Sequence, residues 1–160
     1  MTLLQQLPDV LQIIGQDIKV LAQDTGWRKM TNEKFADGYV AIRRIGNMVF
    51  LNIRGGSYDT FKLRDMVRDQ RQGNREGWRC DLFQLPNGFR PDVPQGVSLY
   101  KDFYKEIGVC MVSSISDGNA ILQLRNKTIP ELEDNKDLRI QEMKFLTSDP
   151  FPKVLPGSQV

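Results

Sequence analysis

The residues best suited to chemistry in this 160-residue chain are its acids, because the sequence contains no histidine. The chain therefore lacks the commonest general base near neutral pH, the Ser-His and Cys-His nucleophile pairs and the commonest metal ligand. Paired carboxylates hydrolyse glycosidic bonds without histidine. Acids lie close together in one polar loop, at Glu131, Glu133, Asp134 and Asp137. No motif places two of them across a cleft. We therefore expect a solvated loop and predict no catalytic residue, metal site or cofactor.

The two cysteines, Cys80 and Cys110, are the other candidates for metal or redox chemistry. They form no Cys-x-x-Cys pair, and Cys110 lies in an apolar run, residues 109–112, that predicts a buried strand. We expect both to be reduced thiols, with Cys110 in the core.

Composition limits the class of protein and its partners. With 40% hydrophobic and 26% charged residues, the chain is expected to form one globular domain with a short appendage. A net charge of +2 does not indicate a nucleic-acid partner. The first ten residues have no basic region, and Pro8 and Asp9 interrupt their apolar run. We therefore predict no signal peptide and no membrane insertion, with synthesis in a cytoplasm.

The most basic part of the chain lies within residues 57–79, where arginines recur between acids. They are Arg64, Arg68, Arg71, Arg75 and Arg79. We expect a solvated charged excursion, and the alternative is a binding patch for an anionic polymer. Trp78 adjoins these arginines. It is either a core residue or a platform on which a sugar ring stacks.

Apolar residues near the N-terminus alternate gaps of three and four, the spacing that keeps one seam of a helix facing a partner helix. They are Leu4, Leu7, Leu11, Ile14, Ile18 and Leu21. Pro8 lacks an amide donor and suits the first turn of a helix. Gly26 suits the position just after the last turn. The pattern predicts a helix over residues 7–24.

Small side chains beside this seam favour an assembly of three helices. With Leu11 and Ile18 at heptad position a, Gly15 and Ala22 occupy e positions, where small residues let several helices approach closely. We predict a homotrimer whose coiled-coil stalk is residues 1–25, held by Leu11, Ile14, Ile18 and Leu21. The alternative is an ordinary amphipathic helix packed inside a monomer, because the repeat is shorter than the three to four heptads of a secure coiled coil.

Strand-like runs separated by turn residues predict a mainly β head over residues 26–160, an antiparallel sandwich or barrel. The clearest element is a hairpin in which residues 38–45 and 48–54 flank a Gly46-Asn47 turn. Further strands are predicted at residues 97–104, 107–115, 120–125 and 138–146.

Proline and glycine mark two more segments. Leu85-Pro86-Asn87-Gly88-Phe89-Arg90-Pro91 predicts a rigid corner between two strands, with Phe89 buried. Residues 148–157 contain too many prolines for a β-ladder. We expect them to lie extended, with Phe151, Val154 and Leu155 docked on the head or on a neighbouring subunit.

Taken in their order along the chain, these predicted segments resemble the C-terminal heads of tail fibres and minor tail proteins of tailed bacteriophages. The resemblance rests on the coiled coil, Thr25-Gly26-Trp27-Arg28, the hairpin at residues 40–49 and the corner at residues 85–91. The closing Pro150-Phe151-Pro152 and Leu155-Pro156-Gly157 look like the ends of such proteins in phages of Gram-positive hosts. The resemblance implies a homotrimeric, mostly β virion protein that is assembled in the host cytoplasm. It also implies a receptor-binding knob that contacts other tail proteins and a host-surface component, commonly a cell-wall saccharide, without covalent chemistry. In that family the corner is structural.

A saccharide partner is expected to meet exposed aromatic rings with acid, amide and guanidinium neighbours. We predict five such residues: Tyr58, Arg75, Trp78, Asp117 and Asn119. Two other functions stay open at this point: a glycan depolymerase that uses paired carboxylates, and a tail assembly adaptor with no host ligand.

Overall fold

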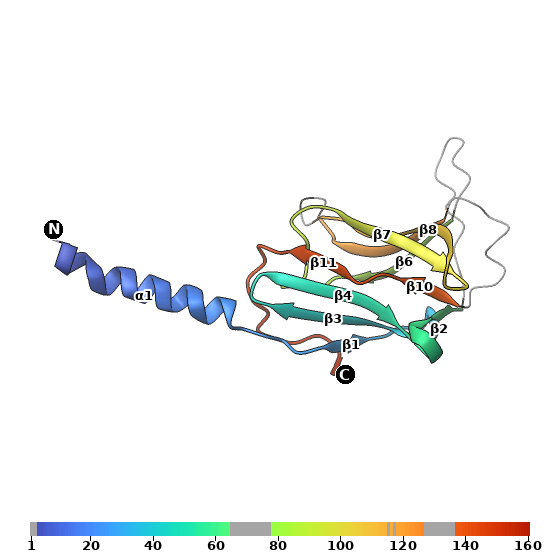
Figure 1. Cartoon of the computed structure of the whole chain (residues 1–160), viewed down its shortest axis with the longest axis horizontal. Helices are drawn as coiled ribbons and strands as arrows, with labels where there is room; N and C mark the ends of the chain where they lie inside the picture. Colours follow the sequence, from blue (N-terminus) through green and yellow to red (C-terminus); the bar gives the residue numbers. More distant parts are fainter. Residues whose placement is uncertain (1–2, 65–77, 115, 117, 127–136) are drawn as a thin grey trace.

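The computed structural model describes residues 3–64, 78–114, 116, 118–126 and 137–160. As predicted, the chain is mainly β and its sheets are antiparallel. One helix, α1, precedes the strands and stands away from them (Figure 1). The strands β1 to β12, with their connections, are called the β body below.

Helix α1 spans Leu3–Leu21, so both of its predicted ends are wrong. Pro8 lies inside the helix, where its missing amide would have paired with the carbonyl of Leu4 in the first turn. Since only one bond near the open end is lost, the helix continues towards the N-terminus. At the other end, Asp24 forms an antiparallel bridge with Ile45, which takes residues 22–24 out of the helix.

The first sheet has five strands in the order β11-β4-β3-β1-β12. The predicted hairpin is confirmed, with partners running from Tyr39 opposite Arg54 to Ile45 opposite Met48. The strands are β1 (Arg28–Met30), β3 (Tyr39–Ile45), β4 (Met48–Arg54), β11 (Met143–Leu146) and β12 (Ser158–Gln159).

The second sheet also has five strands, in the order β10-β7-β8-β9-β6. Three of them match predicted strands with shifted ends, and β6 was not predicted. The strands are β6 (Trp78–Gln84), β7 (Gln95–Lys101), β8 (Lys105–Val112), β9 (Ile121–Asn126) and β10 (Leu138–Ile140). A small ladder joins β2 (Phe35–Asp37) to β5 (Lys62–Leu63), and a 3₁₀ turn, η1 (Ser57–Asp59), precedes β5.

The prediction of one strand over residues 138–146 is wrong, because this segment changes sheets. Strand β10 pairs with β7 in the second sheet, whereas β11 pairs with β4 in the first. Gln141 and Glu142 make the crossing. The crossing ends the β11 ladder at the pair Met143–Leu51, so the last part of β4 has no β11 partner.

Alternate side chains of both sheets enter one hydrophobic core. Inward residues of the first sheet include Ile42 and Leu51, and those of the second include Leu122 and Leu138. Cys80 and Cys110 are free thiols, and Cys110 lies in this core, as predicted. Cys80 is buried in the core as well, which was not predicted. Burial raises the pKa of both thiols.

As predicted, residues 148–157 form no strand, and β12 follows them and pairs with β1. Phe151 is half-buried, and the guanidinium of Arg44 lies over its ring. On this chain Val154 and Leu155 are exposed. Arg28 donates hydrogen bonds to the carbonyls of Pro156 and Gly157, so polar contacts hold the chain end in place. Docking of the apolar residues on a neighbouring subunit stays a prediction.

Candidate functional site

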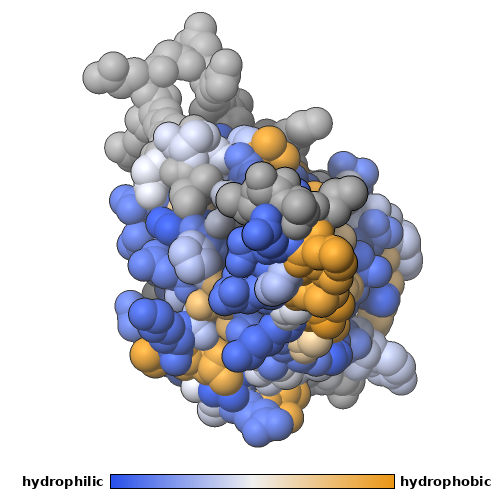
Figure 2. All heavy atoms as spheres, turned by 90° about the vertical axis from the view of Figure 1, so that its left-hand side faces the viewer, coloured by the Kyte–Doolittle hydropathy of each residue, from blue (hydrophilic) through white to orange (hydrophobic). Residues whose placement is uncertain are grey.

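The apolar stripe of α1 is open to solvent. Its large apolar side chains are 46–81% exposed, among them Leu11, Ile14 and Ile18. Figure 2 looks from the helix end of the molecule and shows apolar groups gathered along one side of the helix. The alternative of a helix packed inside its own monomer is therefore wrong for the described side chains, which exclude that of Leu21. No helix in the described ranges is long and apolar enough to cross a membrane.

The base of α1 is fixed to the β3–β4 hairpin. The amide of Gly46 donates to the carbonyl of Gln23 at 2.8 Å, and that of Thr25 donates to the carbonyl of Arg44 at 3.0 Å. Arg43 makes a salt bridge of 2.5 Å with Asp24, and its hydrogen bond lowers the pKa of the Asp24 carboxyl. The chain therefore leaves the helix by pairing with the sheet, rather than through a polar linker.

The predicted corner at residues 85–91 joins β6 to β7, and Phe89 is fully buried, as predicted. Gly88 has a φ of +95°, and a Cβ on it would lie 2.9 Å from the ring of Pro152. A side chain there would be strained and would also displace the C-terminal segment. These contacts give the corner a structural role.

A buried arginine ties the corner to two other segments. Arg44 is 1% exposed and donates to the carbonyls of Gly46, Gly88 and Asp149 at 2.6, 2.7 and 2.9 Å. It also donates to the carbonyl of Pro150. Burial lowers its pKa and the nearby Asp149 carboxylate opposes that shift. Arg44 thus satisfies otherwise orphaned carbonyls at the helix end of the β body.

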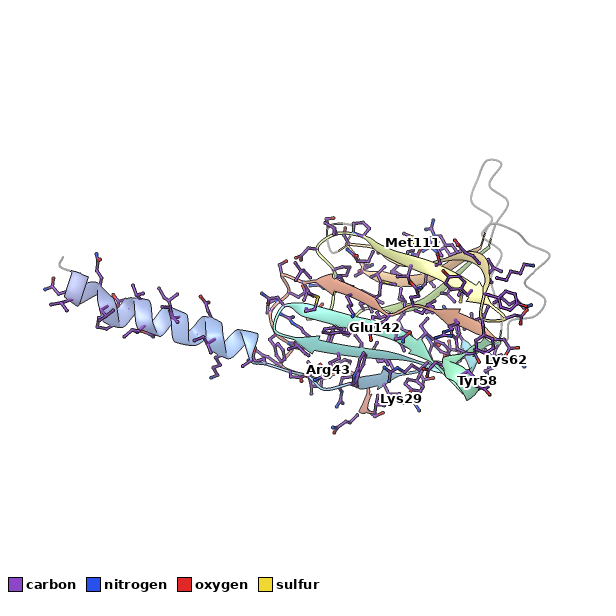
Figure 3. The ribbon with its side chains drawn as sticks, in the orientation of Figure 1. Lys29, Arg43, Tyr58, Lys62, Met111 and Glu142 are labelled. Carbon is purple, nitrogen blue, oxygen red and sulfur yellow. The ribbon has the colours of Figure 1, made fainter. Side chains whose placement is uncertain are left out.

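A pocket of about 620 Å³ opens near the crossing between the sheets. Its lining comes from Asn52 on β4, from the β7–β8 turn and from β10. Glu142 stands one residue beyond the last β11–β4 pair and also lines it. In Figure 3, Glu142 lies at the crossing and Tyr58 at the end of the β body farthest from the helix. We call this feature the distal pocket.

Aromatic rings form one side of the distal pocket. Tyr100, Phe103 and Tyr104 line it. Tyr104 is 85% exposed. Tyr58, 79% exposed, packs edge-to-face on Phe103 with ring centroids 5.8 Å apart. Exposed rings gathered beside a hollow are unusual on a solvated surface and indicate a contact site.

Polar groups of several kinds line the rest of the distal pocket. Arg139 lies directly opposite Tyr100 across the β10–β7 ladder, and within the described part of the chain it has no hydrogen-bond or ion-pair partner. The Oδ1 atom of Asn52 accepts from the amide of Ile53, and the Nδ2 donors have no described acceptor. Asp59 and Glu142 add carboxylates, and Glu142 contacts Lys144 at 3.4 Å.

The backbone around the distal pocket is held in uncommon conformations. Among the described residues, every non-glycine residue with positive φ lies at this end: Tyr58, Asp59, Asp102, Phe103 and Asp137. The amide of Asp102 donates to the carbonyl of Asp137, and Phe61 and Leu138 exchange both amide hydrogen bonds. Three distant segments are thus bonded together, and such strain is typical of functional surfaces.

The structure does not bring all of the predicted binding residues together. Tyr58 adjoins the distal pocket, whereas Asn119 accepts a hydrogen bond from Gln84 at the opposite, helix end of the second sheet. Trp78 begins β6, and its side chain is not described. Arg75 and Asp117 lie outside the described residues, as do the acids Glu131, Glu133 and Asp134. Asp137 is exposed and does not line the distal pocket.

Sequence reasoning missed Phe103, Tyr104 and Arg139. The available signal was the run Asp102-Phe103-Tyr104, which places two aromatic residues in a turn where burial is not expected. Among the residues that the structure describes, no group of three or more Cys, Asp or Glu side chains could hold a metal ion.

Comparison with protein-family models, with curated proteins and with solved structures finds no match for this chain.

Proposed function

We propose that this chain is a receptor-binding head of a bacteriophage tail, assembled as a homotrimer through α1. The observation that carries the proposal is the exposed apolar stripe on a helix that is anchored to the β body. A helix of 19 residues, about 28 Å long, gains little stability without packing, so this stripe requires a partner. Its heptad spacing fits a second and third copy of the same helix.

A second apolar patch at the helix end of the β body supports the same assembly. Met48 and Leu146 are opposite partners on β4 and β11, and both are exposed. Val93 is also exposed, and its neighbour Asp92 donates an amide hydrogen bond to Leu146. Contacts between heads at this patch would continue those between helices. The β sandwich of the head, the stalk of residues 1–25 and the virion tail location are parts of this proposal.

A trimeric stalk gives a physical reason for a modest binding surface on each head. Linked sites raise avidity about 10²–10⁴-fold over one site when the receptor is a polymer. A cell-wall saccharide repeats the same epitope many times, so it suits three identical heads. Other tail proteins would hold the opposite end of the stalk.

Binding to Gram-positive cells tests the proposal. The fluorescently labelled full chain is incubated with a panel of such cells, before and after their treatment with periodate, which cleaves vicinal diols of sugars, or with protease. We expect saturable binding to some cells that periodate abolishes and protease spares. Binding that protease abolishes would contradict a saccharide receptor, and absence of binding to all cells would favour the assembly adaptor.

A further inference from the structure

We infer that the distal pocket is the saccharide site of this chain and that Tyr104 and Arg139 are its main contacts. The inference rests on the proposed receptor-binding function and adds the place and the chemistry of recognition. The inference is based on one hollow of about 620 Å³ that combines exposed aromatic rings with polar groups. Of these polar groups, Arg139 and the Nδ2 group of Asn52 have no described partner.

The volume and composition of the hollow suit a short stretch of a sugar polymer. Ligand sites occupy roughly 300–1,000 Å³ and combine apolar walls with a few placed polar groups. The pyranose ring has a polar rim of hydroxyls and a less polar face of C–H groups. The exposed ring of Tyr104 can cover such a face through dispersion contacts.

The polar wall matches hydroxyl groups, which both donate and accept hydrogen bonds. Arg139 and the Nδ2 group of Asn52 supply donors, whereas Asp59 and Glu142 supply carboxylate acceptors. Hydrogen bonds to the charged groups would be the stronger ones. Because both signs of charge line the hollow, the chemistry favours a neutral polyol over a polyanion, whose phosphates would meet the two carboxylates.

The rigid frame of the hollow favours selective binding. Asp102 is bonded to Asp137, and Phe61 to Leu138, so the turn that carries Tyr104 is fastened to the segment that precedes Arg139. A ligand that bridges Tyr104 and Arg139 therefore meets groups whose backbone is already ordered, which lowers the entropic cost of binding.

One further position provides a control. Lys153 is an exposed cation in the C-terminal segment and does not line the distal pocket. The variant Lys153→Ala removes a positive charge, as Arg139→Ala does, but leaves the distal pocket intact. Tyr104→Trp keeps an exposed ring, whereas Tyr104→Ala removes it.

The test measures binding of the full chain and its variants to soluble wall fragments from a cell that binds the wild type, by titration calorimetry. Chitotetraose and dextran serve as defined probes of N-acetylglucosamine and glucose polymers. We expect Tyr104→Ala and Arg139→Ala each to lower the affinity for the fragments by about tenfold. Tyr104→Trp should stay within about threefold of wild type, and the control variant Lys153→Ala should bind as wild type does.

The outcomes separate this inference from the proposed function. If wild type and both alanine variants bind cells and fragments equally, the site lies elsewhere and the inference is overturned, while the receptor-binding role stands. If wild type binds neither cells nor fragments, the receptor-binding role itself fails. Release of reducing ends from the fragments by the wild type would show that the chain cleaves the polymer and would contradict a binding-only head.

Discussion

The guanidinium of Arg90 holds the carboxylate of Asp149 through two hydrogen bonds, from Nε at 2.9 Å and from Nη2 at 2.8 Å. The same carboxylate accepts from the amides of Gly88 and Arg90. Asp149 is 4% exposed, so this cluster joins the corner at residues 85–91 to the C-terminal segment inside the β body. The contact gives the corner a structural role.

Replacing Asp149 by Ala should lower the free energy of unfolding by about 3 kcal/mol, because Arg90 and two amides lose their acceptor in a buried place. Chemical denaturation monitored by circular dichroism measures the change. Asp92→Ala is the matched control, since the exposed Asp92 carboxylate accepts from Ser148 at the surface. A loss no larger than that of the control would contradict the role given to Asp149.

The same carboxylate should make stability depend on pH. Burial raises the pKa of Asp149, but the hydrogen bonds of Arg90 and of the Gly88 and Arg90 amides outweigh burial and lower the pKa overall. The unfolded value is about 3.9, so this contribution is full above it and is lost as pH falls through the lower folded value. The stability difference between wild type and Asp149→Asn should therefore be constant near neutrality and shrink below about pH 4. A difference that grows in acid would contradict the assignment.

Arg44 should not be replaceable by a shorter cation or by an apolar residue. Arg44→Met would leave buried carbonyls of Gly46, Gly88 and Asp149 without a donor, at a cost of about 3 kcal/mol. Arg44→Lys should lose somewhat less, because its ammonium group can still donate to some of these oxygens, although it cannot reach all of them. Thermal unfolding of both variants checks the order. Arg43→Met, at a partly exposed salt bridge, should cost much less stability than either variant of Arg44.

Gly55 should control the shape of the distal pocket. A Cβ at this position would lie 1.9 Å from the carbonyl oxygen of Thr60, so Gly55→Ala must displace the turn that carries Tyr58 and Asp59. At the neighbouring Gly56 a Cβ meets only the end of the Asp37 side chain, which can rotate away. We expect Gly55→Ala to weaken fragment binding by about tenfold and Gly56→Ala to leave it near wild type. Equal effects of both variants would contradict the argument.

Cys80 and Cys110 should not react in the folded protein, because burial raises both thiol pKa values and excludes reagents. A chromogenic disulfide reagent should label neither cysteine in native buffer and both in denaturant. The labelling rate in intermediate denaturant should follow the unfolding rate. Rapid reaction of Cys110 in native buffer would show that the second sheet opens locally.

Local patterns predicted the parts of the fold that depend on neighbouring residues. The β3–β4 hairpin carries its own alternation and turn, and the corner carries its own prolines and glycine. Strands β1, β5 and β12 are two or three residues long and exist only through distant partners, so their sequences contain little signal. The change of sheet at Gln141 was hidden because both halves of the segment have strand character.

The distal pocket could not be predicted for a related reason. It is built from the end of β4, the β7–β8 turn and the crossing before β11, which are far apart in sequence. The sequence identified Tyr58 as an aromatic residue expected at the surface. Its contact with Phe103, however, depends on the order of the strands in the sheets. Asn119 has suitable chemistry but lies at the end of the second sheet opposite the distal pocket. The reason is that β8 and β9 are antiparallel, and the connection between them, which carries Asn119, lies at the helix end.

The seam of α1 should determine the assembly state. The double variant Ile14→Asp/Ile18→Asp places charges in the proposed helix interface and should release monomers with a folded β body. The matched control, Gln12→Asp/Gln16→Asp, adds the same charges away from the a and d positions and should keep the wild-type assembly. Size-exclusion chromatography and circular dichroism check both properties. An unchanged oligomer in the first variant would place the assembly contacts in the β body.

The mass of the wild-type chain in solution tests the central proposal most directly. Static light scattering across a size-exclusion peak gives this mass independently of molecular shape. Three copies of the 18.4 kDa chain predict a mass of about 55 kDa. That value should persist on dilution to micromolar concentration. A stable monomer of 18.4 kDa would contradict the helical stalk and, with it, the multivalent receptor-binding head.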